Sequence, residues 1–201
     1  MRRLTAEDWA TAALEMIGER GVGGVAVEPL AVRLGATKGS FYWHFANRDA
    51  LVDAALAVWE RERTEAVIVA MDAEPDPARR LHRLFAAVSS GRGDAVEANL
   101  LAAGDHPAVS PVMRRVVDRR LAYVAEIFRR LGCSAVEARR RSLFAYTAFA
   151  GSTTLTTRLP GVMPRPGADL TAYVETAVAV LSIAPDDIRV GGDGTETTEE
   201  A

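Results

Sequence analysis

A glycine between two short helical patterns is the feature that most limits how this chain can fold. Residues 27–34 have apolar side chains at positions 27, 30, 31 and 34, which is the spacing of one helix face. Pro29 suits only the first turn of such a helix, where its missing N–H loses no partner. Gly35 then ends the helix, because glycine readily adopts the left-handed C′ conformation. The pattern predicts a helix, a three-residue turn and a second helix.

The second helix of this pair is short and rich in aromatic residues. Thr37 is its expected N-cap. Phe41 and Phe45 lie four residues apart and can pack inward on the preceding helix. The outer side keeps polar and aromatic groups, and residues 29–48 include no acid. Such a donor-rich surface suits phosphates and base edges, although a small hydrophobic knot with a solvated rim would give the same pattern.

Residues 5–52 resemble the N-terminal domain of the TetR (tetracycline-repressor) family of bacterial regulators. The residues that carry the resemblance are Ala12-Ala13-Leu14, Gly21, Leu30-Ala31, Gly35, Thr37-Lys38-Gly39-Ser40-Phe41-Tyr42-Trp43-His44-Phe45, Asn47-Arg48 and Leu51. One departure is Ala26, where a Ser or Thr N-cap is usual in the family. It puts that cap in doubt, but not the fold, and such a cap is typically worth about 1 kcal/mol.

The resemblance implies an all-α homodimer that binds operator DNA, usually as a repressor released by a small ligand. It places residues 37, 38, 39, 42 and 44 at the DNA and residue 48 close to a phosphate. Together with two further residues of the exposed surface, the predicted DNA-binding set is Thr37, Lys38, Gly39, Ser40, Tyr42, Trp43, His44 and Arg48.

Composition limits the class of protein further. Of the 201 residues 49% are hydrophobic, enough for a sizeable core, and the net charge is −3, so any affinity for DNA depends on where the charges lie. The single cysteine, Cys133, excludes an intrachain disulfide. No apolar run approaches the roughly 20 residues of a membrane-spanning helix, and no signal-peptide h-region follows Arg2-Arg3. We expect a soluble, cytoplasmic protein with no membrane partner.

The rest of the chain reads as helices, which predicts an all-α fold. No segment alternates like a strand. Helices outside the turn region are expected over residues 5–20, 47–72, 77–90, 94–103, 108–132, 134–159 and 169–184. We assign a three-helix helix-turn-helix DNA-binding domain to residues 1–50, a helical ligand-binding and dimerisation domain to 51–190, and a disordered acidic tail to 191–201. Arg2 and Arg3 form either a short arm that reaches phosphate or a disordered start.

Two faces of the helix over 134–159 suggest an interface and a pocket. Small residues between Phe144 and Leu155 would let a second helix approach, and with the helix over 169–184 they predict a four-helix bundle across a twofold axis. Another face would help to line a mostly apolar cavity for a small-molecule effector. The predicted ligand-binding residues are Phe85, Asn99, Tyr123, Phe128, Tyr146, Phe149, Thr153 and Thr157. Ordinary intrachain packing would explain both patterns as well.

No combination of residues indicates catalysis. The three histidines, His44, His82 and His106, lack metal-ligand spacing, and the many arginines between 114 and 141 most simply form an exposed face, with an anionic ligand as the alternative. We expect no enzyme activity, metal or cofactor. The predicted function is a homodimeric, sequence-specific repressor of transcription, released from its operator by a small, mostly apolar ligand. The alternatives are a regulator that needs no ligand and an all-α ligand-binding or protein-interaction module whose DNA binding is vestigial.

Overall fold

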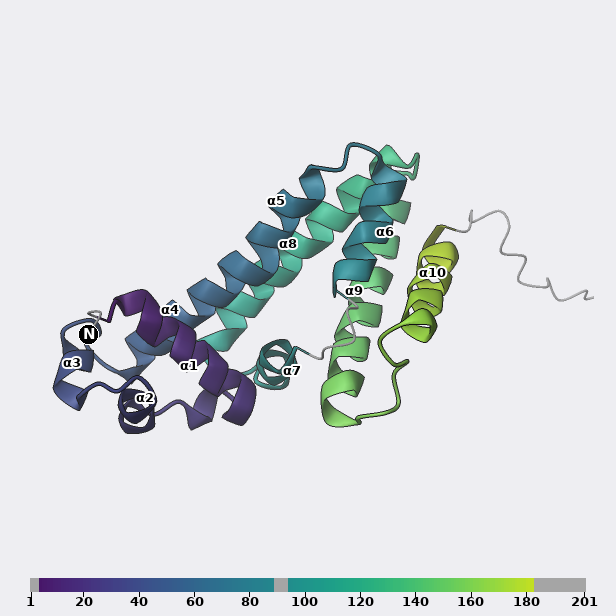
Figure 1. Ribbon diagram of the computed structural model, residues 1–201. Coiled ribbons are helices and arrows are strands. Elements are labelled where there is room, and N and C mark those ends of the chain that lie inside the picture. The colour runs from purple at the N-terminus through teal and green to yellow at the C-terminus, as the bar shows by residue number, and fades with distance from the viewer. Residues whose placement is uncertain (1–3, 89–93, 183–201) are drawn as a thin grey trace, which may run out of the picture.

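A long helical rod joins the two ends of the molecule. In the computed structural model, which describes residues 4–88 and 94–182, the rod consists of α4 (Arg48–Glu60), a π-helical segment η2 (Arg61–Glu65) and α5 (Ala66–Asp72). Helix α8 (Val109–Arg130) runs beside it (Figure 1). The described residues form helices and no strand, which confirms the all-α prediction.

The N-terminal helices gather at one end of the rod. They are α1 (Ala6–Arg20), the short 3₁₀ turn η1 (Val22–Gly24), α2 (Val27–Arg33) and α3 (Lys38–Tyr42). Helix α1 begins with a capping box between Thr5 and Asp8. Helix α2 begins at Ala26 without a side-chain cap.

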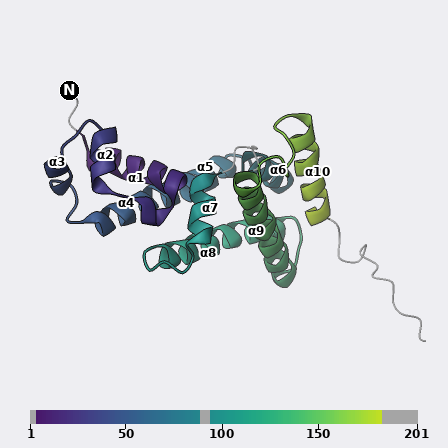
Figure 2. The same cartoon turned by 90° about the horizontal axis from the view of Figure 1, so that it is seen from below.

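The C-terminal helices are α6 (Pro77–Val88), α7 (Ala95–Ala102), α9 (Ala135–Arg158) and α10 (Ala168–Ser182). Helices α6 and α10 lie toward the other end of the rod, as Figure 2 shows, whereas α7 packs between α1 and α9. Within the described residues, the predicted helix boundaries agree with the observed ones to within a few residues. Arg2 and Arg3, the predicted helix ends at 89–90 and 183–184, and the acidic tail at 191–201 lie outside the described residues. No described helix has the length and apolar character needed to cross a membrane.

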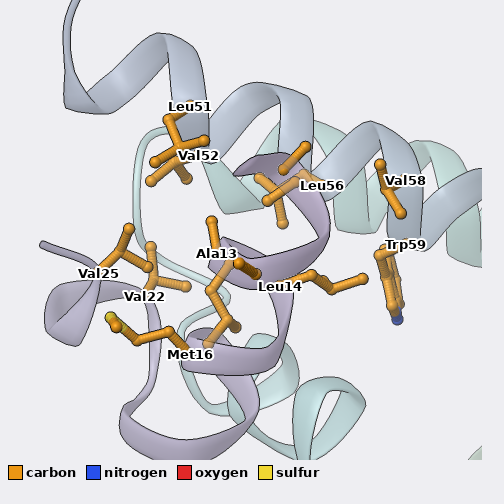
Figure 3. Packing of buried hydrophobic residues seen from close by; sticks show 14 of the residues in the cluster. Ala13, Leu14, Met16, Val22, Val25, Leu51, Val52, Leu56, Val58 and Trp59 are labelled. Carbon is orange, nitrogen blue, oxygen red and sulfur yellow. The ribbon is translucent and has the colours of Figure 1, made fainter. Parts of the chain in front are cut away.

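The larger hydrophobic core extends across the predicted boundary at residue 50. Trp59 of α4 is fully buried and packs in the same cluster as Leu14 of α1 (Figure 3). That cluster also includes Leu100 of α7 and Val116 of α8. A second cluster, centred on Ile127, joins α6, α8, α9 and α10. The helix-turn-helix unit is thus packed directly on the start of the C-terminal body, so a shift of α7 or α8 can reach it.

Candidate nucleic-acid interface and effector pocket

The turn before α3 has the geometry that the sequence predicts. Gly35 has φ 63°, in the left-handed region. Its N–H donates to the carbonyl of Val32 at 3.1 Å, and the N–H of Ala36 donates to that of Ala31 at 2.8 Å, which together form a Schellman motif. The Thr37 hydroxyl then accepts the N–H of Ser40 at 3.2 Å and caps α3. The two caps fix the angle between α2 and α3.

Helix α3 is anchored by aromatic packing on one side and open on the other. The Phe41 ring is fully buried, with its centroid 5.5 Å from that of Trp9 and 5.6 Å from that of Phe45. Tyr42 is 55% exposed and Trp43 is 85% exposed. The exposed side therefore carries two large aromatic groups whose burial would be favourable on contact with another surface.

The basic side chains near α3 already have partners in the folded protein. Lys38 Nζ lies 2.6 Å from Glu28 Oε1, so α3 is ion-paired to α2. This contact raises the pKa of Lys38 and lowers that of Glu28, mainly through the hydrogen bond between the two. Arg33 Nη2 similarly lies 2.7 Å from Glu19 Oε2. Residues 29–48 contain no acid, but Glu19 and Glu28, which lie outside this interval, reach the surface around α3 in the folded protein.

Arg48 holds the turn that precedes α2. Its Nε donates to the Val25 carbonyl at 2.8 Å and its Nη2 donates to the Val22 carbonyl at 2.5 Å. Two of the guanidinium's five N–H donors are therefore used on backbone carbonyls of η1 and its cap, and Nη1 donates to Asp49 Oδ1 at 3.3 Å. A contact between Arg48 and phosphate stays a prediction, and the structure gives this residue a role in positioning α2.

Helix α7 connects the helix-turn-helix unit to the C-terminal body. Asn99 Nδ2 donates to the carbonyls of Ile17 (2.8 Å) and Gly18 (3.0 Å) at the end of α1, and its Oδ1 accepts from Arg158 of α9. A side chain at Gly18 would approach Val96 of α7 to 3.1 Å, so the two helices are in close contact there. Asn99 is thus a link between helices.

A cavity of about 180 Å³ lies between the rod and helices α6, α7, α8 and α9. Five of the eight predicted ligand-binding residues line it: Phe85, Tyr123, Tyr146, Phe149 and Thr153. The other three do not. Asn99 contacts α1, Phe128 is buried in the second core cluster, and the Thr157 hydroxyl is buried away from the cavity without a hydrogen-bond partner. Helical periodicity identified the correct helices but not which side chains reach the cavity.

A buried ion pair forms the polar wall of this cavity. Arg120 Nη1 lies 2.8 Å from Glu97 Oε1, and Nη2 lies 3.2 Å from Glu97 Oε2. Only 1% of Glu97 is exposed, and burial raises the pKa of its carboxyl despite the nearby guanidinium. Arg120 also donates to the Thr64 hydroxyl at 3.0 Å and to the Arg63 carbonyl in η2 at 3.2 Å.

This pair corrects the interpretation of the arginine-rich segment as one exposed face. Arg120 is largely buried, and its guanidinium carbon lies 5.3 Å from the Trp59 ring centroid and 5.7 Å from that of Phe149. Arg115 and Arg119 are more exposed but pair with Glu60 and Glu65 of the rod. The sequence did not single out Glu97, because an acid in a short helix has no signal that distinguishes a buried partner from a solvated one.

These features together define a class: an all-helical protein with a helix-turn-helix at one end and a partly apolar cavity in the helical body at the other. Among the described residues, no group of His, Cys, Asp and Glu side chains is arranged to hold a metal ion.

Comparison with known proteins makes the class specific. Residues 11–55 match the family model described as bacterial regulatory proteins, tetR family. Over 54 residues the chain is 43% identical to the class D tetracycline repressor protein of Escherichia coli and equally to the class H protein of Photobacterium damsela subsp. piscicida. Each match covers 27% of this chain and 25% of the relative, so the chain spans about a quarter of the length of these relatives.

Solved structures extend the likeness to the rest of the fold. A transcriptional regulator from Rhodococcus sp. Rha1 has a TM-score of 0.73 and 20% identity over 90% of this chain and 100% of that one. A TetR-family regulator from Agrobacterium tumefaciens has a TM-score of 0.71 and 19% identity, covering 85% and 96%. The N-terminal domain therefore belongs to the TetR family, on a body with the fold of TetR-family transcriptional regulators.

Proposed function

We propose that this protein is a homodimeric repressor that binds operator DNA through α3 and is released by a small, mostly apolar ligand in the cavity. The observation that carries the proposal is the pairing of an exposed aromatic recognition surface at one end of the rod with a cavity at the other. The DNA contacts are assigned to the exposed set around Lys38, Tyr42 and Trp43. One similar structure contains a bound small molecule, which supports a ligand-responsive protein: multidrug binding protein EbrR, complexed with malachite green, has a TM-score of 0.64 at 22% identity over 89% of this chain and 98% of that one.

A dimer is supported by exposed apolar residues on the helices farthest from α3. Leu143 and Phe144 of α9 are 53% and 57% exposed, and Val180 of α10 is 50% exposed. Pairing these helices with a second copy would bury them in a four-helix bundle. Two copies would also present two α3 helices to successive major grooves, about 34–36 Å apart.

Replacing Phe144 with aspartate is expected to raise the dimer dissociation constant by about 30-fold or more, because a central aromatic contact of an interface is typically worth at least about 2 kcal/mol. Sedimentation equilibrium measures this constant directly. Val69→Asp is the matched control, since Val69 is 71% exposed on α5, away from these helices. Equal effects of the two substitutions, or none of either, would contradict the assignment of the interface.

The ligand signal is proposed to travel through α7 and the rod. Glu97 contacts Arg120 at the cavity wall, and Asn99, two residues further along α7, binds the last carbonyls of α1. Arg120 in turn contacts η2 of the rod. A ligand that moves α7 or Arg120 would therefore change the spacing of the two α3 helices. Its effect on operator affinity is limited by its differential affinity for the two arrangements.

The proposal is tested by titrating the protein with DNA from the region upstream of its own coding sequence at two salt concentrations. Saturable binding that survives competitor DNA and weakens with salt is expected, because each phosphate contact releases counterions. Binding that any competitor DNA removes, across candidate operators from the whole genome, would favour the alternative of vestigial DNA binding.

A further inference from the structure

The size of the cavity limits the effector. Its volume is about 180 Å³, and much of its wall is formed by Ile68, Leu84, Phe85 and Phe149. An engineered apolar cavity of about 150 Å³ holds one benzene molecule. The cavity described here therefore has room for one ring with a short substituent.

The charges of the cavity wall exclude a charged effector. Arg120 and Glu97 satisfy each other through two contacts, and Arg63 lies 3.4 Å from Asp94. An anion would have to take Arg120 from Glu97 or Arg63 from Asp94, and the first exchange would leave a buried carboxylate without its partner. A cation would have to displace a guanidinium that Thr64 and the Arg63 carbonyl also hold. With two acids and two bases paired, the wall offers no net charge to a ligand.

One polar side chain at the cavity is poorly hydrogen-bonded. Tyr146 lines the cavity, and its Oη has no well-formed hydrogen bond, although Arg120 lies close to it. The Oη atom itself is covered, so a ligand oxygen reaches it when the Tyr146 side chain turns toward the cavity. An unsatisfied buried hydroxyl is costly, so a ligand atom that pairs with it gains affinity. Burial, reinforced by the Glu97 carboxylate and opposed by Arg120, raises the pKa of Tyr146 to about 12. The hydroxyl therefore keeps its proton at neutral pH and can donate it.

We infer that the effector is an uncharged molecule with a single ring and one hydroxyl or carbonyl oxygen, and that this oxygen accepts a hydrogen bond from Tyr146 Oη. The inference rests on the proposed function, in which this cavity is the effector site, and it adds the chemical class of the ligand and the residue that selects it.

Four probes of nearly equal size distinguish an uncharged ligand with a hydroxyl from a purely apolar, an anionic and a cationic one. They are benzyl alcohol, toluene, benzoate and benzylamine. Isothermal titration calorimetry of the whole protein at neutral pH gives each dissociation constant. Benzyl alcohol is expected to bind most tightly, toluene about 2- to 10-fold more weakly for lack of one hydrogen bond, and the two ions at least tenfold more weakly than benzyl alcohol.

The role of Tyr146 is tested by Tyr146→Phe, which removes only the hydroxyl. This variant is expected to lose the 2- to 10-fold preference for benzyl alcohol over toluene while its affinity for toluene stays unchanged. Tyr173→Phe is the matched control, because the Tyr173 hydroxyl pairs with Ser152 and does not line the cavity. The control should keep the preference. Far-UV circular dichroism confirms that both variants are folded.

Three results would overturn the inference: tighter binding of benzoate or benzylamine than of benzyl alcohol, a preference for benzyl alcohol that survives Tyr146→Phe, or no binding of any probe at millimolar concentration. Titrating the same protein with operator DNA distinguishes failure of the inferred ligand class from failure of the proposed repressor function. Operator binding without the expected probe binding defeats only the ligand class. The expected probe binding without operator binding defeats the proposed repressor function.

Discussion

Replacing Tyr42 with alanine is expected to weaken operator binding by about tenfold to a hundredfold, since a lost base contact typically costs about 1–3 kcal/mol. Tyr42 is 55% exposed, so its side chain is available to DNA. The fold should survive, because the Phe41 ring keeps its contacts with Trp9 and Phe45. Fluorescence anisotropy with labelled operator DNA measures the affinity, and thermal unfolding checks the fold. Unchanged affinity would contradict the assignment of α3 as the recognition helix.

Substitutions of the two members of the Lys38–Glu28 ion pair should change operator affinity in opposite directions. Lys38→Ala removes the phosphate contact proposed for this residue and is expected to flatten the slope of log affinity against log salt by about one unit. Glu28→Gln frees Lys38 from its partner 2.6 Å away and removes an acid from the DNA-facing surface, so affinity should rise. Because both residues are exposed, neither change should alter thermal stability much. Weaker DNA binding by Glu28→Gln would show that this acid positions α3 rather than competing with phosphate.

Replacing Glu97 with alanine is expected to lower the free energy of unfolding by about 3–5 kcal/mol, because the change leaves Arg120 buried without its carboxylate. Urea unfolding followed by circular dichroism measures the loss. Glu65→Ala is the matched control: it breaks the Arg119–Glu65 pair, another ion pair made by α8, but both partners are nearly half exposed. The control should cost about 1 kcal/mol or less. Similar losses in the two variants would contradict the special role of the buried pair.

The double substitution Glu97→Leu with Arg120→Leu measures how much the intact ion pair contributes to the free energy of unfolding. The single substitution measures the cost of leaving one partner buried alone. The raised pKa of Glu97 indicates that desolvation of the carboxylate outweighs its attraction to Arg120. A matched apolar pair is therefore expected to unfold with a free energy close to that of the original protein, or higher. The double variant should nonetheless respond less to the effector in operator titrations, because it lacks the contacts between Arg120 and η2.

The parts of the fold that could be predicted are those whose causes lie within a few residues. The Gly35 turn, the cap at Thr37 and the helix lengths all follow from local geometry, and the structure confirms them. The rod was also predicted as one continuous helix, although the π-helical turn inside it was not.

The features that could not be predicted from the sequence depend on contacts between residues far apart in the chain. Arg120 lies among many arginines, and its burial depends on Glu97, 23 residues earlier, and on Thr64, 56 residues earlier. Asn99 reads as a pocket residue on its own helix, yet it hydrogen-bonds to α1, 82 residues away. Amphipathic periodicity specifies the inward face of each helix, but tertiary packing decides which inward residue faces a cavity and which faces core.

The π-helical turn η2 also determines how far the residues beyond it are rotated about the axis of the rod. A π turn accommodates one residue more than an α-helix, and each residue of an α-helix advances about 100° around the axis. The face of the rod that contacts α8 beyond η2 is thus displaced by nearly a third of a turn from the face that an uninterrupted helix would present. Deleting one residue from Arg61–Glu65 would remove the extra residue and give a regular helix whose two ends keep their present relative orientation. The one extra residue that η2 accommodates therefore decides which side chains of α5 face α8.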